Sequence, residues 1–222
     1  MPLSSIGTLN EGSLHAALKQ EYLGADGAEE VAVGSHVADV LRDGVIYEIQ
    51  TSSFSGLGNK MRALIKHYPV VLVHPISVRR TLLRMRDEQT GEFTKRVSPK
   101  HGKLIDIVGQ LVYVPELLGH ANFSVEAVLT EEEELTVFDA KARRGRGGWR
   151  RRGRSLVNIQ HRQRFASPTD LLSFFQAPLP DEFDSAEISR ALGEKRDIGQ
   201  QMAYCLRHLG LIEISGKQGN SF

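Results

Sequence analysis

The chain has 222 residues and a net charge of +1, with 41% hydrophobic and 25% charged residues. This composition is typical of a globular protein with a real core, and the length suits one large domain or a medium domain followed by a small one. No apolar run approaches the ~20 residues of a membrane span, no signal peptide is recognised, and the single cysteine excludes a disulfide framework and a cysteine-based zinc site. We therefore expect a cytoplasmic protein that has no membrane contact.

The first part of the chain predicts a helix followed by a hairpin. Thr8 and Glu11 have the spacing of a capping box, and apolar residues follow at helical spacing from Leu14 to Tyr22. The segment from about residue 30 to 51 predicts strands in EEVAV, HVADVLR and VIYEIQT. The Asp43-Gly44 pair between the last two is a strong signal for a two-residue hairpin turn.

The middle of the chain alternates helical and extended patterns. The expected elements are a helix at about Ser55–His67, a buried central strand at Val70–Val73, a hairpin over Thr81–Val97, a helix at about Lys103–Val112, and strands near 123–129, 135–138 and 155–160. This order predicts an α/β domain with a mixed sheet flanked by helices.

Two blocks of like charge stand out. Glu131 to Glu134 form an acidic run, and residues 141–154 hold seven arginines and one lysine without an acid. Such blocks are usually mobile and solvated, and arginine-rich ones often bind polyanions. The predicted phosphate contacts are Arg143, Arg144, Arg146, Arg150, Arg151, Arg152 and Arg154, with Trp149 stacking on a base. The alternative is a loop that only keeps the protein soluble.

The hairpin places two acids opposite each other. With Asp43 and Gly44 as its loop, Asp39 pairs with Glu48, and Gln50 projects from the same face. Opposed like charges destabilise a sheet, and a divalent cation offsets the repulsion. Magnesium is typically held by one or two carboxylates together with phosphate oxygens and water. The alternatives are a slipped register or carboxylates that point into solvent.

The stretch HVADVLRDGVIYEIQTSSFS resembles the core of the PD-(D/E)XK nuclease superfamily. Its form is most similar to the Glu-x-Gln variant of CoiA-like nucleases, which also carry Ala-Asp-Val before the hairpin. The resemblance implies a restriction-endonuclease-like fold, and it spans about residues 8–75. It implies that Asp39 and Glu48 bind Mg²⁺ or Mn²⁺. Gln50 stands where most members have a catalytic lysine, and an amide supplies no positive charge.

Two further residues are candidates for that site. Lys60, on the following helix, can supply the missing cation, the alternative being an exposed helical lysine. Superfamily members often place an acid on the first helix, which makes Glu11 a catalytic candidate beside its capping role. His15 is expected at the helix surface or in the core rather than as a ligand.

A proline-rich segment from Ser167 to Asp184 predicts a boundary between a nuclease-like domain, residues 1–166, and a small domain, residues 167–222. The small domain predicts two helices and a wing over Leu211–Phe222, and it resembles a winged helix-turn-helix. The residues expected to contact DNA are Lys195, Arg196, Gln200, Gln201, Tyr204, Arg207 and Lys217. Winged helices also serve as protein-interaction modules, so that role stays open.

The leading hypothesis is a metal-dependent DNA endonuclease or DNA-processing enzyme that hydrolyses phosphodiester bonds. The alternative is a non-catalytic DNA-binding or regulatory protein with a degenerate nuclease fold, and a protein-interaction adaptor is a third. The sequence leaves open whether the chain forms a homodimer.

Overall fold

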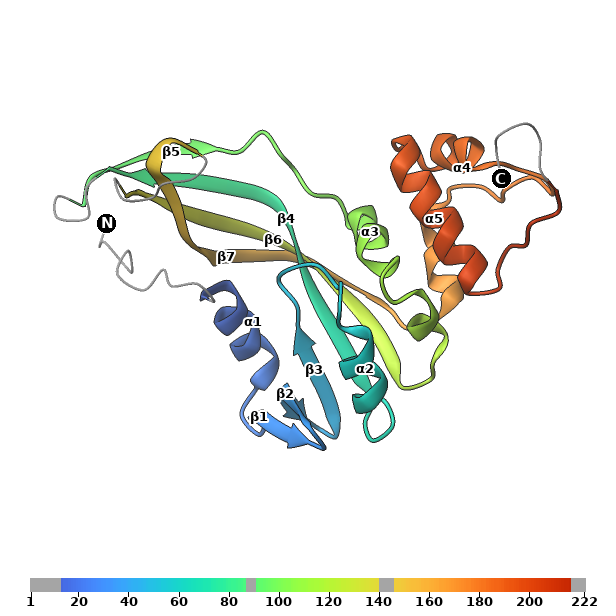
Figure 1. Cartoon of the computed structure of the whole chain (residues 1–222), viewed down its shortest axis with the longest axis horizontal. Coiled ribbons are helices and arrows are strands. Elements are labelled where there is room, and N and C mark those ends of the chain that lie inside the picture. The colour runs from blue at the N-terminus through green and yellow to red at the C-terminus, as the bar shows by residue number, and fades with distance from the viewer. Residues whose placement is uncertain (1–12, 87–90, 140–145, 217–222) are drawn as a thin grey trace.

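A computed structural model describes residues 13–86, 91–139 and 146–216. These residues form a mixed seven-stranded sheet flanked by helices (Figure 1), which confirms the predicted α/β class. The strands are β1 (Ala28–Val33), β2 (His36–Arg42), β3 (Val45–Ile49), β4 (Val70–Met85), β5 (Phe93–Val97), β6 (Phe123–Phe138) and β7 (Trp149–Phe165). The α-helices are α1 (Ser13–Leu23), α2 (Gly58–Leu64), α3 (Val108–Leu111), α4 (Ser185–Leu192) and α5 (Arg196–His208). The 3-10 helices are Leu104–Ile107, Pro115–Gly119, Arg146–Gly148 and Pro168–Phe174.

The strands lie in the order β1-β2-β3-β4-β6-β7, and β5 pairs with the outer half of β4. β4 runs parallel to both β3 and β6, and the other pairs are antiparallel. The first hairpin has the predicted register from Arg42 opposite Val45 to Val40 opposite Tyr47, but the expected next pair, Asp39 with Glu48, is not part of the ladder. Asp43 and Gly44 both have positive φ, 53° and 74°, as a type I′ turn requires.

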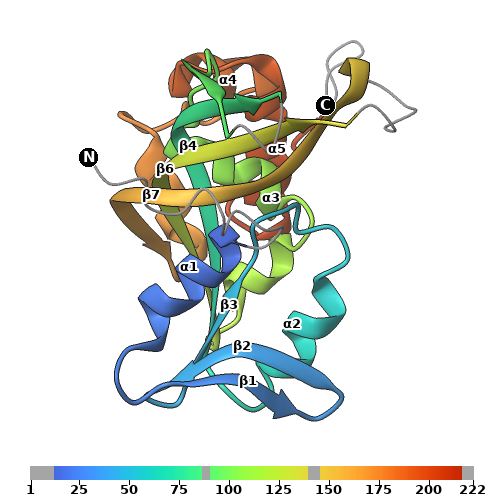
Figure 2. The ribbon, with the colours of Figure 1, turned by 90° about the vertical axis from the view of Figure 1, so that its left-hand side faces the viewer.

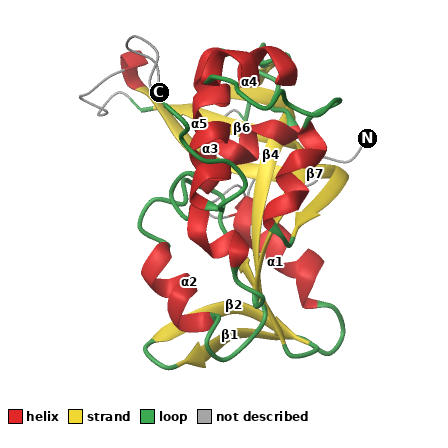
Figure 3. Ribbon diagram, turned by 90° about the vertical axis from the view of Figure 1, so that its right-hand side faces the viewer, coloured by secondary structure: helices red, strands yellow, loops and turns green. Residues whose placement is uncertain are grey.

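Helices cover both faces of the sheet. Leu14, Leu18 and Tyr22 of α1 pack against one face, where they meet buried residues of β2, β3, β4 and β6. The opposite face is covered by α2, α3 and α5, together with part of α4. Figure 2 shows α1 and α2 on either side of β3, and Figure 3 shows α3, α4 and α5 grouped on the second face. None of the helices in the described ranges has the length or apolar character needed to span a bilayer.

The long strands correct the prediction for the charged blocks. β6 runs without a break through Glu131–Glu134, and β7 includes residues 149–154, so neither run is a loop there. Opposite charges on neighbouring strands explain the difference, because β4 and β7 place arginines beside the glutamates of β6. Residues 140–145 of the arginine run lie outside the described residues.

Two expected helices are shorter than the apolar periodicity predicted. The helix expected over residues 55–67 is limited to α2, and the one expected over 103–112 is a 3-10 helix followed by a single turn, α3. The start of the first predicted helix, with Thr8 and Glu11, lies outside the described residues. The turn of the second hairpin, residues 87–90, also lies outside, while the pairing of Thr81 with Val97 confirms the hairpin itself.

The C-terminal part contains the two predicted helices. Asp184 caps α4 by accepting hydrogen bonds from two backbone N–H groups, and Gly193 ends the helix in the left-handed conformation. α5 buries Met202, Cys205 and Leu206 in the same core as the strand residues of the face that α2 and α3 cover. The wing strand predicted at Leu211–Ile214 is not present, because residues 211–216 form no strand, and residues 217–222 lie outside the described chain.

Candidate functional site

Asp39 and Glu48 lie side by side where β2 and β3 separate. The backbone pairing of the two strands ends at Val40 and Tyr47. Beyond that point the Asp39 carboxylate accepts the Ile49 N–H at 2.7 Å, and the Glu48 carboxylate accepts the Asp39 N–H at 3.4 Å. Each carboxylate therefore accepts a backbone N–H group of the opposite strand, in place of the cross-strand backbone hydrogen bond that is missing there.

Two cationic or titratable side chains reach this pair from different helices. His15 of α1 places Nε2 3.2 Å from Oδ2 of Asp39. Lys60 of α2 donates to Oε1 of Glu48, which is almost fully buried. Lys60 is thus an ion-pair partner of Glu48 rather than an exposed helical lysine without a contact. His15 contacts the site instead of serving only as a surface or core residue.

The environments of the two acids shift their pKa values in opposite directions. Burial alone would raise the pKa of Asp39, but hydrogen bonds from His15 and Ile49 and the nearby charges outweigh it and lower the pKa. Burial and the charge of Asp39 raise the pKa of Glu48, and Lys60 offsets only part of this rise. Asp39 is therefore the stronger acid, and Glu48 holds a proton more readily.

The two carboxylates of Asp39 and Glu48 suit Mg²⁺, which keeps several waters, better than a metal whose ligands all come from the protein. Within the described residues no group of three or more His, Cys, Asp and Glu side chains converges. Mg²⁺ is commonly bound through one or two carboxylates while it keeps waters and phosphate oxygens. Asp39 and Glu48 match that requirement, although protein donors already occupy three of their four oxygens. Glu11 lies outside the described residues.

Gln50 belongs to the loop after β3 and does not contact either carboxylate. Its amide nitrogen donates to Ser52 Oγ at 2.9 Å and to the Ser53 carbonyl at 2.6 Å. The main-chain carbonyl of Gln50 accepts a hydrogen bond from Nδ1 of His74 at 2.7 Å. Burial lowers the pKa of His74 to about 4, so the ring is neutral near pH 7 and holds the loop through this bond. Sequence reasoning missed His74, because a lone histidine in an apolar strand gives no signal.

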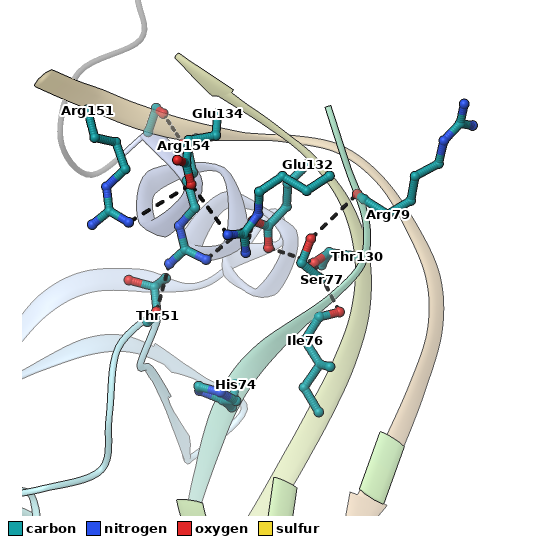
Figure 4. A network of polar contacts seen from close by, with 12 residues as sticks. Thr51, His74, Ile76, Ser77, Arg79, Thr130, Glu132, Glu134, Arg151 and Arg154 are labelled. Atoms are coloured by element: carbon teal, nitrogen blue, oxygen red, sulfur yellow. Dashed lines mark hydrogen bonds and ion pairs between the residues drawn. The ribbon is translucent and has the colours of Figure 1, made fainter. Parts of the chain in front are cut away.

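A buried charge network on β4, β6 and β7 holds the same loop. Glu132 is fully buried and contacts Arg80 at 3.2 Å and Arg154 at 3.3 Å. Thr130 donates a further hydrogen bond to Glu132. Arg154 also donates to the Thr51 carbonyl at 2.8 Å (Figure 4). The strand-type residues on both sides of the acidic run were the signal that could have placed Glu132 inside a sheet.

The predicted phosphate-binding residues of β7 have contacts of their own. Arg150 pairs with Asp139, and Arg151 lies 4.0 Å from Glu134. Both arginine side chains stay more than half exposed, and Arg152 is exposed as well. Arg154 is mostly buried in the network with Glu132. Arg143, Arg144 and the side chain of Arg146 lie outside the described residues.

Trp149 packs within the sheet. Its ring makes an edge contact with Phe138 at a centroid distance of 5.6 Å, and the guanidinium of Arg84 lies over the ring at 5.2 Å. The face of the ring under Arg84 is therefore already in contact with a side chain of the same sheet.

The exposed side of α5 carries most of the residues predicted to contact DNA. Lys195, at the start of the helix, and the side chains of Arg196, Gln200, Tyr204 and Arg207 are exposed. The latter four line a hollow of about 350 Å³ whose far wall is formed by residues 212–216. Gln201 differs, because its Oε1 is buried against Gly109 of α3 without a hydrogen-bond partner in the described chain. Lys217 lies outside the described residues.

Comparison with known proteins places the chain in a family. A family model described as "Domain of unknown function (DUF8091)" matches residues 12–166, so the chain belongs to this family. It is also similar to an "Uncharacterized protein" of Treponema pallidum (strain Nichols), with 29% identity over 221 residues that cover 98% of this chain and 86% of the relative. No solved structure matches.

Proposed function

We propose that this protein is a metal-dependent DNA endonuclease or DNA-processing enzyme, a divergent PD-(D/E)XK nuclease of the Glu-x-Gln type. The observation that carries the proposal is the convergence of Asp39, Glu48 and Lys60. Two carboxylates whose pKa values are pushed in opposite directions, with a cation in contact, are characteristic of acid–base and metal sites. Structural ion pairs also produce such shifts, and a cleavage assay separates the two roles.

Each residue has a distinct role in the proposed reaction. Asp39 and Glu48 would hold Mg²⁺ or Mn²⁺, which when bound polarises a phosphoryl oxygen and lowers the pKa of a water. Lys60 would shift from Glu48 toward the phosphate and provide the charge that Gln50 lacks. His15 orients the Asp39 carboxylate through its hydrogen bond. Gln50 then acts indirectly. Its side chain hydrogen-bonds Ser52 and Ser53 and so maintains the shape of the loop after β3.

We also propose that α4 and α5 form a helix-turn-helix that contacts DNA. The support is the row of exposed polar and cationic residues on α5, which includes Arg196, Gln200 and Arg207. Gln201 is not part of this proposal because it packs against α3.

A second function has a specific observation in its favour. The carboxylates of Asp39 and Glu48 already bond the backbone and close the gap between β2 and β3, so they have a structural role without metal. A non-catalytic DNA-binding protein with a lapsed nuclease site would keep this arrangement.

The decisive experiment is a cleavage assay with labelled single-stranded, duplex, mismatched and branched DNA in Mg²⁺, Mn²⁺ or EDTA. We expect cleavage only with metal, and its loss in Asp39→Asn and Lys60→Met, while Lys66→Met, a change at an exposed lysine just beyond α2, keeps it. DNA binding by all four proteins should be similar.

Gln50→Lys adds a control. If the site works, this change alters the rate of an existing activity. A wild-type protein that is inert on every DNA, with an active Gln50→Lys variant, would establish the lapsed-site alternative. Cleavage in EDTA, or undiminished cleavage by Asp39→Asn, would exclude the metal mechanism.

A further inference from the structure

The outer halves of the long strands form an arm that extends beyond the helices (Figure 1). We define the arm as the paired residues of β4 from Arg79, of β5, of β6 from Glu131, and of β7 as far as Leu156. Arg84 pairs with Thr94 of β5 and with Thr136 of β6, so these strands form one continuous sheet.

The register assigns each side chain of the arm to one of two faces, because opposed residues share a face and successive residues alternate. The site face carries the charged residues Arg80, Arg84, Arg96, Glu132, Glu134, Arg151 and Arg154. The opposite face carries Arg79, Lys95, Glu131, Glu133 and Arg150. The ion pairs agree with this assignment, because those among the described residues of the arm each join side chains of one face. Figure 4 shows Arg79 extending away from the Glu132 network.

The two faces differ in charge balance. At the paired positions of the site face, five arginines stand against two glutamates, which leaves an excess of three positive charges, and Arg152, in the bulge of β7, is counted on neither face. On the opposite face, Arg79, Lys95 and Arg150 are balanced by Glu131 and Glu133, together with Asp139, the partner of Arg150.

The excess charge lies on accessible side chains. Within the described residues, the exposed Arg84 and Arg96 make no ion pair, and Arg151 is 57% exposed. The contact of Arg84 with the ring of Trp149 holds one of these charges in place. The site face therefore presents cations to a partner outside the arm.

This face begins at the candidate site. Arg154, at its inner end, donates to the carbonyl of Thr51, which lies three residues after Glu48. Ser13 of α1 donates to the carbonyl of Arg154 on the same side. From Arg154 to Trp149 the face extends outward by about 17 Å, at about 3.3 Å per residue.

We infer that the site face of the arm binds the phosphate backbones of a DNA duplex that enters the Asp39–Glu48 site, mainly through Arg84, Arg96 and Arg151. These cations lie on β4, β5 and β7, which span about 14 Å at about 4.8 Å per strand spacing. Cations spread across the sheet can contact the two phosphate backbones that border a groove of a duplex, whereas a single strand offers only one backbone. The contacts read no base, so this binding is independent of sequence. The inference rests on the proposed function, because it supplies the substrate surface of the same site.

The test compares two double variants that each remove one cation from β4 and one from β5. Arg84→Gln with Arg96→Gln changes the site face, and Arg79→Gln with Lys95→Gln changes the opposite face. Binding of the full-length protein to a short labelled duplex is followed by fluorescence anisotropy in EDTA over a NaCl series. Each lost phosphate contact reduces the slope of log K against log salt by about 0.9. We expect a reduction of about 1.8 for the site-face variant and almost none for its control.

Arg96→Gln alone guards against a folding defect, because Arg96 is exposed and makes no ion pair within the described residues. We expect this single change to reduce the slope by about 0.9. Equal slopes for the two double variants, or tighter binding of the matching single strand than of the duplex, would overturn the inference. Because the assay contains no metal, it separates the two proposals. If the site-face variant has a reduced slope but the wild-type protein cleaves no DNA, the binding surface is supported and the cleavage proposal is refuted. If the wild-type protein cleaves DNA but the two double variants have equal slopes, the cleavage proposal is supported and the binding surface is refuted.

Discussion

Glu132→Gln tests the stability provided by the buried network. The wild-type carboxylate is fully buried and interacts with Arg80, Arg154 and Thr130. Glutamine keeps the volume of the side chain but removes the charge, and its amide nitrogen cannot accept hydrogen bonds from the arginines. The variant therefore leaves two guanidinium groups without their shared counter-charge.

The magnitude follows from how completely the charges are buried. Removal of one partner of a fully buried ion pair costs about 3–5 kcal/mol. Here the arginines are partly hydrated, with side-chain exposures of 28% for Arg80 and 19% for Arg154. Each also keeps one contact, Arg80 with Glu134 and Arg154 with the carbonyl of Thr51. We therefore expect a loss of about 2–3 kcal/mol in the free energy of unfolding, or roughly 4–12 °C in the melting temperature.

Urea unfolding monitored by circular dichroism measures this loss, and the adjacent residue provides a matched control. Glu133 lies on the opposite face of the same strand, is 30% exposed, and pairs with Lys95, which is 60% exposed. Glu133→Gln should cost at most about 1 kcal/mol, as for other exposed ion pairs. If the two variants lose the same small amount of stability, the network does not stabilise the arm and the reasoning is wrong.

Two further predictions concern packing and pH. A methyl group at Gly199 would lie 2.0 Å from Ser189 Oγ and 2.6 Å from the Ser185 carbonyl. Gly199→Ala should therefore lower the free energy of unfolding by about 1–3 kcal/mol, as measured by thermal unfolding. The control Gly216→Ala, with open space around the added methyl group, should have no effect. The folded-state pKa of His74 is about 4 against 6.5 for the free side chain, so the unfolded chain takes up a proton first as the pH falls. Stability should therefore decrease between pH 6.5 and 4, by at most about 1.4 kcal/mol per unit. His74→Asn should flatten that dependence, and an unchanged urea profile would show that another group controls it.

Local patterns in the sequence were sufficient for several elements. The Asp43-Gly44 pair predicted both the turn and the register of the first hairpin, because few residues other than glycine, asparagine and aspartate adopt positive φ readily. Asp184 and Gly193 marked the two ends of α4 because capping depends on nearby backbone groups. That register was enough to bring Asp39 and Glu48 together as candidate residues.

What the sequence by itself determined is therefore local: turns, caps, apolar periodicity, and the α/β class to which they add up. The tertiary structure decided the buried charge network and the distribution of charge over the sheet, because both depend on strands that are far apart in the chain. Glu132 became a buried core residue only because β4 and β7 bring Arg80 and Arg154 beside it. The same pairing turned two charged blocks into strands and distributed their charges unequally between two faces. Electrostatic compensation across a sheet is a property of neighbours in space, and no window of adjacent residues contains it.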